Sequence, residues 1–298
     1  MEKIKIIFLG TSNAIPTKKR NHTAILLSHK NEKILIDCGE GTQRQFKIAD
    51  ISATKLTRIL LTHWHGDHIL GLPGIFQTLA MSNYQKTLEL HGPKKTLQNF
   101  SLFNNLFNFK IKIKVHEHNE GKILEEKDFI IDSKQMSHDT PCLAYSFATK
   151  DKIHLDKNKL KKLKIPNSPM LGELQKGKDI IFKGKKIKAK NLTYIEKGKK
   201  VTIILDTKFN SNAIKLAQNS DLLICESSFS KQEEKQAHEY NHMTAIESAL
   251  IAKKANVKKL ILTHLSQRYE HKPKIIENEA KKIFKNTKLA NDFDVVEI

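Results

Sequence analysis

The chain has 298 residues, of which 39% are hydrophobic, and its formal net charge is +20 at pH 7. This composition is sufficient for a sizeable buried core, and no apolar run approaches the roughly 20 residues of a membrane span, so disordered and transmembrane classes are excluded. The positive charge favours a polyanionic partner such as nucleic acid. A biased composition is the competing interpretation, because only four of the 52 basic residues are arginine.

Apolar runs of strand length recur along the chain, and some of them are separated by segments with helical periodicity. The runs cover residues 3–10, 23–28, 33–39, 58–63, 87–92, 112–118, 143–149, 201–207, 221–228 and 259–264, and the helical segments cover Ile69–Met81, Asn212–Asn219 and His242–Ala255. This order predicts a mixed α/β fold. RILLTH at 58–63 and KLILTH at 259–264 resemble each other, which suggests two related halves that each end a strand on a histidine.

Lys150–Lys200 departs from this pattern, with seventeen lysines against five acidic residues. A long basic segment between two well-patterned halves is typical of an excursion from the main fold, and a solvated surface loop is the alternative. We therefore expect one domain over residues 1–298 with an inserted arm at residues 150–198.

The stretch LTHWHGDH, Leu61–His68, places three histidines and an aspartate directly after an apolar run. Such a density of polar groups would be costly in a core, so it indicates a site. His138, Asp206 and His264 also follow predicted strands, where α/β sheets place their ligands. Imidazole and carboxylate donors without nearby cysteine favour an open, catalytic site for zinc or a similar metal.

These residues are sufficient for two metal ions. The first ion is assigned His63, His65 and His138, the second Asp67, His68 and His264, and Asp206 is able to bridge them. Asp37 is expected to support the ligands as a hydrogen-bonded partner without binding the metal itself. The stretch VHEHN, with His116 and His118, lacks the following Asp-His pair and is interpreted as solvated surface.

THWHGDH, with LIDCGEGTQ upstream and HMTA and THLSQRY downstream, resembles the metallo-β-lactamase superfamily and, within it, the ribonuclease Z family. The resemblance extends over nearly the whole chain. It implies an αββα sandwich with an inserted basic exosite arm, and an endoribonuclease with two zinc ions per chain. The implied reaction removes the 3′ trailer of precursor tRNA, leaving a 3′-hydroxyl on the tRNA and a 5′-phosphate on the trailer. The Lys150–Lys200 segment occupies the place of the tRNA-binding arm.

The resemblance also implies roles for single residues. His242 in NHMTA would protonate the leaving oxygen, and Glu226 would orient the His242 ring through its other nitrogen. Asp67, a ligand with a carboxylate oxygen to spare, is expected to hold and deprotonate the attacking water. Arg44 and Arg268 are candidates for phosphate or subunit contacts. A homodimer is implied as well.

Two other functions compete with this interpretation. Another hydrolase on the same scaffold, such as a phosphodiesterase or arylsulfatase for small molecules, would not need a basic arm. An RNA-binding protein with a vestigial site is less favoured, because every ligand is present. No targeting signal precedes the first predicted strand, and Cys38, Cys142 and Cys225 do not form a disulfide pattern, so we expect a cytoplasmic protein without membrane attachment.

Overall fold

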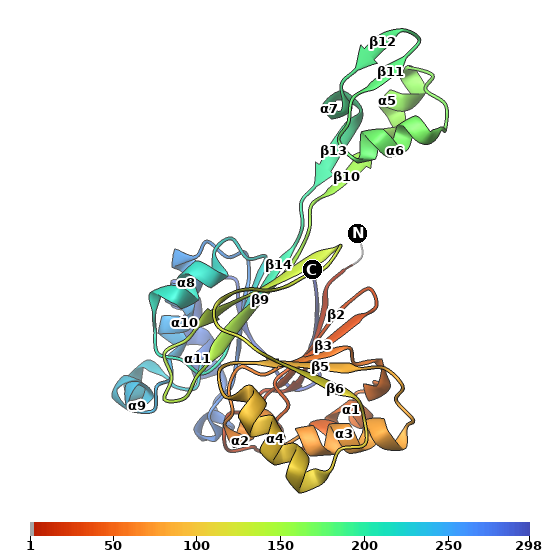
Figure 1. Ribbon diagram of the computed structural model, residues 1–298. Coiled ribbons are helices and arrows are strands. Elements are labelled where there is room, and N and C mark those ends of the chain that lie inside the picture. The colour runs from red at the N-terminus through yellow and green to blue at the C-terminus, as the bar shows by residue number, and fades with distance from the viewer. Residues whose placement is uncertain (1–2) are drawn as a thin grey trace. The chain divides into compact units, whose positions relative to one another are not determined.

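The computed structural model describes residues 3–298 (Figure 1). The chain divides into two compact units. The larger unit comprises the chain up to Glu125, Ile131–Phe147 and Lys200–Ile298, and the smaller unit comprises Glu126–Ile130 and Ala148–Lys199.

The first sheet of the larger unit has seven strands in the order β18-β1-β2-β3-β4-β5-β6. The strands are β1 (Lys5–Gly10), β2 (Ala24–His29), β3 (Glu32–Ile36), β4 (Arg58–Leu60), β5 (Leu88–Gly92), β6 (Ile113–Glu117) and β18 (Val295–Glu297). From β3 to β6 the strands run parallel, so the segments that follow them leave from the same edge of the sheet. The C-terminal strand β18 pairs with β1 in antiparallel register.

The second sheet also has seven strands, in the order β17-β16-β15-β14-β9-β8-β7. The strands are β7 (Gly121–Glu125), β8 (Phe129–Gln135), β9 (Leu143–Thr149), β14 (Lys200–Ile204), β15 (Leu222–Glu226), β16 (Leu260–Thr263) and β17 (Thr287–Leu289). β14 to β17 are parallel. β4 and β16, which hold the two similar apolar runs, lie inside their sheets rather than at the margins.

Helices cover one face of each sheet. Those of the first half are α1 (Thr42–Ile48), α2 (Gly66–Ile69), α3 (Leu72–Met81) and α4 (Thr96–Phe107), and those of the second half are α8 (Ser211–Ala217), α9 (Glu234–Glu239), α10 (Ala245–Lys254) and α11 (Lys274–Ile283). Single turns of 3-10 helix occur at Ala53–Lys55, Lys231–Glu233 and Gln267–Tyr269. None of the helices within residues 3–298 has the length and apolar character needed to cross a bilayer.

The two sheets pack against each other through their other faces. In β2, Ala24 and Leu26 join the core beneath α1 and α3, yet Ile25 and Leu27 on the opposite face are buried as well. Both faces of the strand must therefore be covered. The Tyr145 hydroxyl in β9 donates to the Leu61 carbonyl after β4 at 2.6 Å, which links the sheets directly. The predicted αββα sandwich is confirmed.

The smaller unit is folded around a core of its own. Its elements are β10 (Lys152–Leu155), α5 (Lys157–Lys162), α6 (Pro169–Gln175), β11 (Ile180–Phe182), β12 (Lys185–Ile187), α7 (Ala189–Leu192) and β13 (Thr193–Glu196). β10 pairs with β13 and β11 with β12. Its buried side chains are Leu160, Ile165, Leu174, Ile180, Ala189 and Leu192. The basic segment is thus a folded element rather than an irregular loop.

Each of the ten predicted apolar runs contains a strand, but one predicted helix is broken. The segment Ile69–Met81 is interrupted at Gly71, whose N–H donates to the Cys38 carbonyl at 2.9 Å. A Cβ on Gly71 would lie 2.1 Å from the carbonyl oxygen of Gly39, so only glycine permits this contact. β7, β8, β17 and β18 were not predicted; in β7 every residue is at least partly exposed, so the strand leaves no apolar run.

Candidate active site

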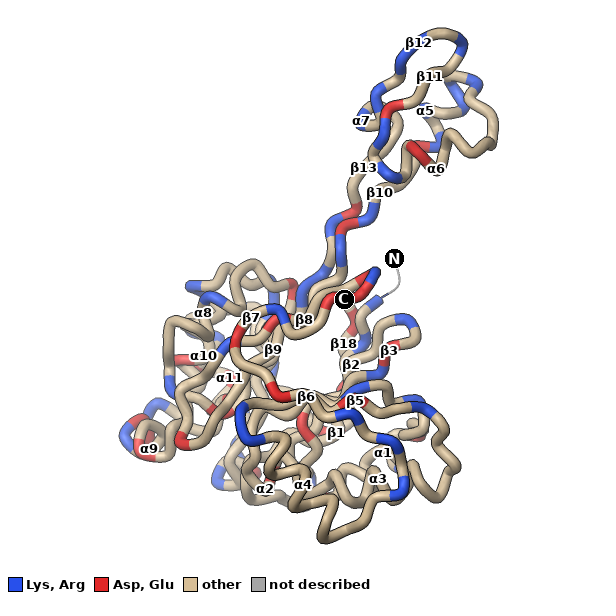
Figure 2. The backbone as a smooth tube through the Cα atoms, viewed as in Figure 1, with Lys and Arg blue, Asp and Glu red and all other residues tan. Residues whose placement is uncertain are grey.

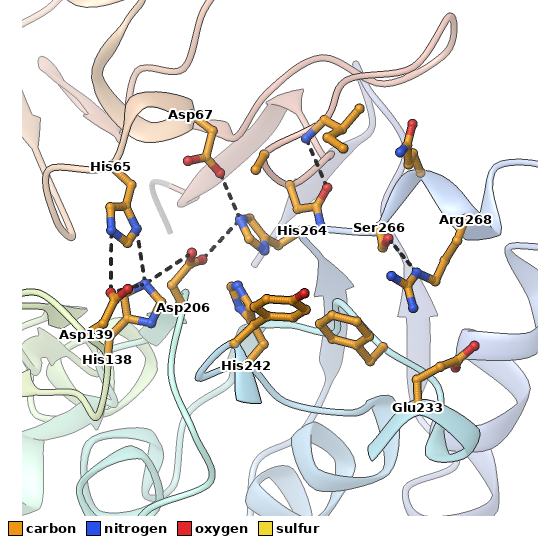
Figure 3. Close-up of a pocket in the computed structure, with 16 residues that line it drawn as sticks. His65, Asp67, His138, Asp139, Asp206, Glu233, His242, His264, Ser266 and Arg268 are labelled. Atoms are coloured by element: carbon orange, nitrogen blue, oxygen red, sulfur yellow. Dashed lines mark hydrogen bonds and ion pairs between the residues drawn. The ribbon is translucent and has the colours of Figure 1, made fainter. Parts of the chain in front are cut away.

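The histidine-rich loop Leu61–His68 begins where β4 ends. His63 and His65 precede the one-turn helix α2, while Asp67 and His68 lie within it. The His68 N–H donates to the His65 carbonyl at 3.1 Å, which closes the loop into a turn. Its side chains can therefore converge from a single strand end, and Figure 3 shows His65 and Asp67 facing Asp206 and His264 across the cavity.

Asp37, which follows β3, fixes this loop from behind. One carboxylate oxygen accepts from the Thr62 N–H at 2.7 Å, and the other accepts from the Thr62 hydroxyl at 2.7 Å and from Nδ1 of His68 at 2.6 Å. Asp37 is fully buried, so these bonds are shielded from water. The carboxylate holds the His68 ring with Nε2 directed away from Asp37, as expected for a group that supports a ligand.

The chain after β3 approaches the loop closely enough to require a second glycine. The Cys38 N–H donates to the His68 carbonyl at 2.8 Å. A Cβ on Gly39 would lie 2.3 Å from the carbonyl oxygen of Asp67 and 2.4 Å from Cβ of His22. Any larger residue would push the backbone that carries Asp67, so Gly39 belongs to the construction of the site.

Five histidines and two aspartates gather into two groups that share Asp206. Within each group the possible ligand atoms lie within 4.8 Å of one another; the groups are His63, His65, His138 and Asp206, and Asp67, His68, Asp206 and His264. Asp206 Oδ2 lies 3.6 Å from His63 Nε2 and 3.4 Å from His68 Nε2, and its Oδ1 lies 3.1 Å from His264 Nε2. All seven residues assigned from the sequence are therefore brought together.

Four of the five histidines donate Nδ1–H away from the point where the groups meet. The acceptors are the Thr62 hydroxyl for His63, Asp37 for His68, the Asn241 carbonyl for His138 and the Ser228 hydroxyl for His264. The Thr62 and Ser228 hydroxyls donate their own protons to carboxylates, which leaves them free to accept from the rings. Each of these rings therefore turns Nε2 into the site.

This arrangement fits a pair of metal ions. Nε2 of His68, Nε2 of His264 and Oδ1 of Asp206 are buried, and their close approaches to one another and to Asp206 Oδ2 do not have hydrogen-bond geometry. His65 presents Nδ1 instead, 3.1 Å from His63 Nε2 and 3.2 Å from His138 Nε2. Converging lone pairs of neutral imidazole repel one another unless a cation accepts them. The donor set of imidazole and carboxylate suits a divalent metal.

Backbone conformation at the strand ends supports the convergence. Asp37, Asp206 and His264 all follow strands and all adopt left-handed backbone, with φ of 54°, 33° and 59°. This region costs an L-residue about 1 kcal/mol or more, and such residues cluster at functional sites. The left-handed conformation ends the extended backbone at each of these residues, so the chain turns where the side chain of the site begins.

Charges in the site oppose one another. Burial lowers the pKa of His63, and the neighbouring His68 lowers it further, well below its ordinary value. Burial would raise the pKa of Asp206, but His264 and His68 outweigh it and hold that pKa well below the usual range. Burial would also raise the pKa of Asp67, but His68 and His264 outweigh burial and lower this pKa below its ordinary value. Both carboxylates are therefore ionised at neutral pH.

His242 and Glu226 form a further pair beside the ligands. His242 Nδ1 lies 3.1 Å and 3.2 Å from the two oxygens of Glu226, which is fully buried at the end of β15. Glu226 also accepts from the Thr207 N–H at 2.7 Å and from the Ser228 hydroxyl at 2.8 Å. Ser228 thereby connects Glu226 to His264, a link that no sequence motif indicated.

Burial and charge act in opposite directions on His242. Burial lowers the pKa of His242, but attraction to Glu226 and Asp206 and the hydrogen bond to Glu226 outweigh it, and the pKa rises to about 9. At neutral pH the ring is therefore protonated. Nε2 is the remaining N–H, and it belongs to a side chain that lines the cavity (Figure 3).

Five of the seven ligand candidates and His242 line a cavity of about 860 Å³. The other two, His63 and His68, are fully buried behind it. Arg268 lines it too, lying 4.9 Å from the centre of the Phe229 ring and donating to Gln236 at 2.6 Å. Asp139, which was not singled out, approaches His65 Nε2 at 3.4 Å. Its position directly after His138 was the only signal in the sequence.

The other arginines have different surroundings. Arg20 is buried and donates to Thr11, to the Ala290 carbonyl and to Asn291, so it joins the two ends of the larger unit. Arg58 forms ion pairs with Glu32 and Glu89. Arg44 lies exposed on α1.

An αββα sandwich with this set of histidines and aspartates at its strand ends defines a metal-dependent hydrolase of the metallo-β-lactamase fold. Residues 4–288 match the family model described as "Anti-Pycsar protein Apyc1". Ribonuclease Z of Methanothermobacter thermautotrophicus is 40% identical over 298 residues, which cover 99% of this chain and 97% of that protein. Ribonuclease Z of Nanoarchaeum equitans is 38% identical and covers 89% of this chain and 84% of its own length. The chain belongs to the ribonuclease Z family.

Solved structures agree with this family. The short form of human tRNase Z superposes with a TM-score of 0.71 at 25% identity, covering 98% of each chain. The metallo-β-lactamase fold protein YhfI from Bacillus subtilis superposes with a TM-score of 0.74 at 20% identity over the full length of both chains, which supports the fold alone.

The pair of His242 and Glu226 leads to a prediction for the metal-free protein, prepared with a chelator. Glu226→Gln removes the charge that raises the pKa of His242, so this pKa should fall from about 9 towards or below about 6.5. A raised folded-state pKa stabilises the protein fully below the unfolded value of about 6.5, and this stabilisation is lost as the pH rises through about 9. NMR titration of the imidazole and unfolding between these pH values measure both effects.

Glu247→Gln is the matched control, because Glu247 accepts from another histidine, His238, at 2.8 Å. It should leave the pKa of His242 unchanged. An unchanged pKa of His242 in Glu226→Gln would contradict the assigned coupling.

Proposed function

We propose that this protein is a zinc-dependent endoribonuclease that removes the 3′ trailer of precursor tRNA, leaving a 3′-hydroxyl on the tRNA and a 5′-phosphate on the trailer. The observation that carries the proposal is the seven-residue ligand set around one cavity, in a chain of the ribonuclease Z family. The human tRNase Z structure supports the choice of tRNA as substrate.

Zinc is the metal that we assign, with two ions per chain. His63, His65 and His138 would hold one ion, Asp67, His68 and His264 the other, and Asp206 both. Imidazole and carboxylate donors are typical of catalytic zinc sites. When bound, such a pair of ions polarises a phosphodiester and lowers the pKa of water at the site.

Two residues of the chain would move protons in the reaction. Asp67 is ionised, because His68 and His264 lower its pKa, and it holds the attacking water and accepts a proton from it. The water oxygen forms a bond to phosphorus, and the bond from phosphorus to O3′ breaks. His242 gives its proton to O3′, and Glu226 stabilises the charged ring before the transfer.

The smaller unit is proposed to be the arm that binds tRNA. Lysines recur along its backbone from β10 to β13 (Figure 2). Around the turn between β11 and β12, Lys183, Lys185 and Lys186 are all exposed. Such side chains bind phosphates without reading sequence. The unit has its own core, so it can contribute affinity without taking part in the chemistry.

We also propose a homodimer that works in the cytoplasm. On α4, Leu102 and Leu106 are four residues apart, lie on one side of the helix and are more than half exposed, and an exposed apolar pair of this kind favours a subunit contact. Sedimentation equilibrium would distinguish dimer from monomer. The three cysteines are buried free thiols, which suits a reducing compartment.

A phosphodiesterase or arylsulfatase for small molecules is the alternative on this scaffold. The basic unit favours the larger, polyanionic substrate.

The first test uses a 3′-extended tRNA transcript. The active site should contain about two zinc ions per chain, the protein should cut once at the trailer junction, and a chelator should abolish cleavage. His65→Ala should lower the metal content and remove activity, because His65 Nδ1 faces both His63 and His138. His271→Ala, which changes an exposed histidine of the larger unit outside the cavity, is the control. Cleavage by metal-stripped protein in chelator would refute the mechanism, and cleavage of small phosphodiesters alone would favour the alternative.

The second test separates proton transfer from metal binding. His242→Ala should lower kcat for tRNA by about 10²–10⁴-fold with unchanged zinc content. Bis(p-nitrophenyl) phosphate has a good leaving group that needs no proton, so its hydrolysis should be much less affected. His238→Ala, which lies outside the cavity, should leave both rates unchanged. Equal losses for the two substrates would rule out His242 as the acid.

The third test concerns the smaller unit. Replacing Asp156–Lys190 by a short Gly/Ser linker retains the paired strands β10 and β13 and the fold of the larger unit. Binding of precursor tRNA should weaken severely and lose much of its salt dependence, while hydrolysis of a small phosphodiester continues at a similar rate. Kd as a function of salt and small-substrate kcat measure the two effects.

A charge-matched pair of variants refines this test. Lys183→Gln, Lys185→Gln and Lys186→Gln together should weaken tRNA binding more than the same change at Lys282, Lys285 and Lys288 of the larger unit. Equal effects would mean that net charge, rather than this unit, governs affinity.

A further inference from the structure

A second histidine cluster lies on β5 and β6, outside the seven-residue ligand set. His91 and His116 are register partners on these parallel strands, and Glu89 lies two residues before His91, on the same face. The possible ligand atoms of these three residues lie within 4.8 Å of one another. The sequence favoured solvated surface for His116 and His118, but both are partly buried, and His91 is only 2% exposed.

Two nitrogens of this cluster are buried without a partner. They are Nε2 of His91 and Nε2 of His116, whose rings stack with centroids 4.6 Å apart and planes 9° apart. Protein interiors rarely leave a buried polar atom unbonded unless an ion or water completes it. Two such atoms on adjacent strands indicate a common ligand between them.

His118 determines how the His91 ring is presented. Its Nε2 lies 2.9 Å from Nδ1 of His91, so Nδ1 is engaged and Nε2 is the nitrogen left for a ligand. Burial, followed by the neighbouring His116 and His118, lowers the pKa of His91 to about 4. The ring is therefore neutral at pH 7, the form in which imidazole binds a metal.

Glu89 supplies a carboxylate that is already held in place. Arg58 Nε donates to its Oε2 at 2.8 Å, and the same oxygen lies 3.6 Å from Nε2 of His91. A carboxylate has about four lone-pair positions, so Glu89 can accept from Arg58 and still bind a cation. Arg58 then has the orienting role that outer partners have at metal sites.

We propose that Glu89, His91 and His116 form a separate binding site for one zinc-class divalent ion, which ties the edge strand β6 to β5. Two imidazoles and one carboxylate are a ligand set that zinc accepts, with a fourth position open to water. Ligands of tetrahedral zinc lie about 3.3 Å apart, so on binding the cluster contracts and the stacked His91 and His116 rings tilt towards each other.

The test counts zinc in full-length protein after chelator treatment, reloading with Zn²⁺ and removal of free metal. His91→Ala and His116→Ala should each bind about one ion fewer per chain than wild type. Zinc should raise the Tm of wild type more than that of either variant, because binding to the folded state alone stabilises it. His116 is only partly buried, so His116→Ala keeps the test valid if His91→Ala folds poorly.

Two controls separate this site from the proposed active site. His154→Ala, which changes a histidine paired with Glu196 and stacked on Tyr194, should lose no zinc. In a His63→Ala/His264→Ala background, which lacks a ligand to each proposed active-site ion, about one ion should remain and should be lost on adding His116→Ala. Equal zinc content in wild type, His91→Ala and His116→Ala would overturn the site, whatever the outcome for the active-site ions.

Discussion

The buried carboxylate of Asp206 is the interaction on which the site depends. It belongs to both ligand groups, and it comes from the second sheet, whereas His63 and His68 come from the first. An ionised carboxylate that is only 3% exposed is unfavourable unless cations or hydrogen-bond donors surround it. The two sheets must therefore meet at their strand ends before this charge is balanced, and the packing of the fold and the assembly of the site are one event.

Supporting residues turn this meeting point into a directed site. Asp37 and Ser228 do not face the cavity, yet they hold His68 and His264 by Nδ1 and so aim the opposite nitrogens inward. Glu226 accepts a hydrogen bond from the Ser228 hydroxyl and also binds Nδ1 of His242. One buried carboxylate thus couples a metal-ligand candidate to the group proposed to protonate the leaving oxygen, and the two cannot be adjusted independently.

Polar chemistry in this chain is concentrated at sheet margins and strand ends. The central strands bury aliphatic side chains on both faces, whereas Glu89, His91 and His116 occupy the last two strands of the first sheet. The basic charge of Lys150–Lys200 lies in a unit with its own core. Because each part is stabilised by its own contacts, affinity for a polyanion and the chemistry at the metal ligands can vary separately.

The sequence by itself determined the elements whose signal is local. β4 and β16 were predicted because parallel strands buried on both faces read as continuous apolar runs. The histidine loop was evident because its ligands are close in sequence, and the family resemblance assigned His242 and Glu226. Even there, the break at Gly71 was missed, because it depends on the backbone of Gly39 from another part of the chain.

Only the tertiary structure decided which distant residues act together. Ser228 and His264 are 36 residues apart, and nothing in a serine after a strand indicates that it orients a histidine. His91 and His116 become neighbours only through the register of β5 and β6, so a stretch that reads as solvated surface is partly buried and forms a ligand cluster. Strand pairing and sheet packing create these contacts, and neither leaves a periodic pattern in the sequence at the residues concerned.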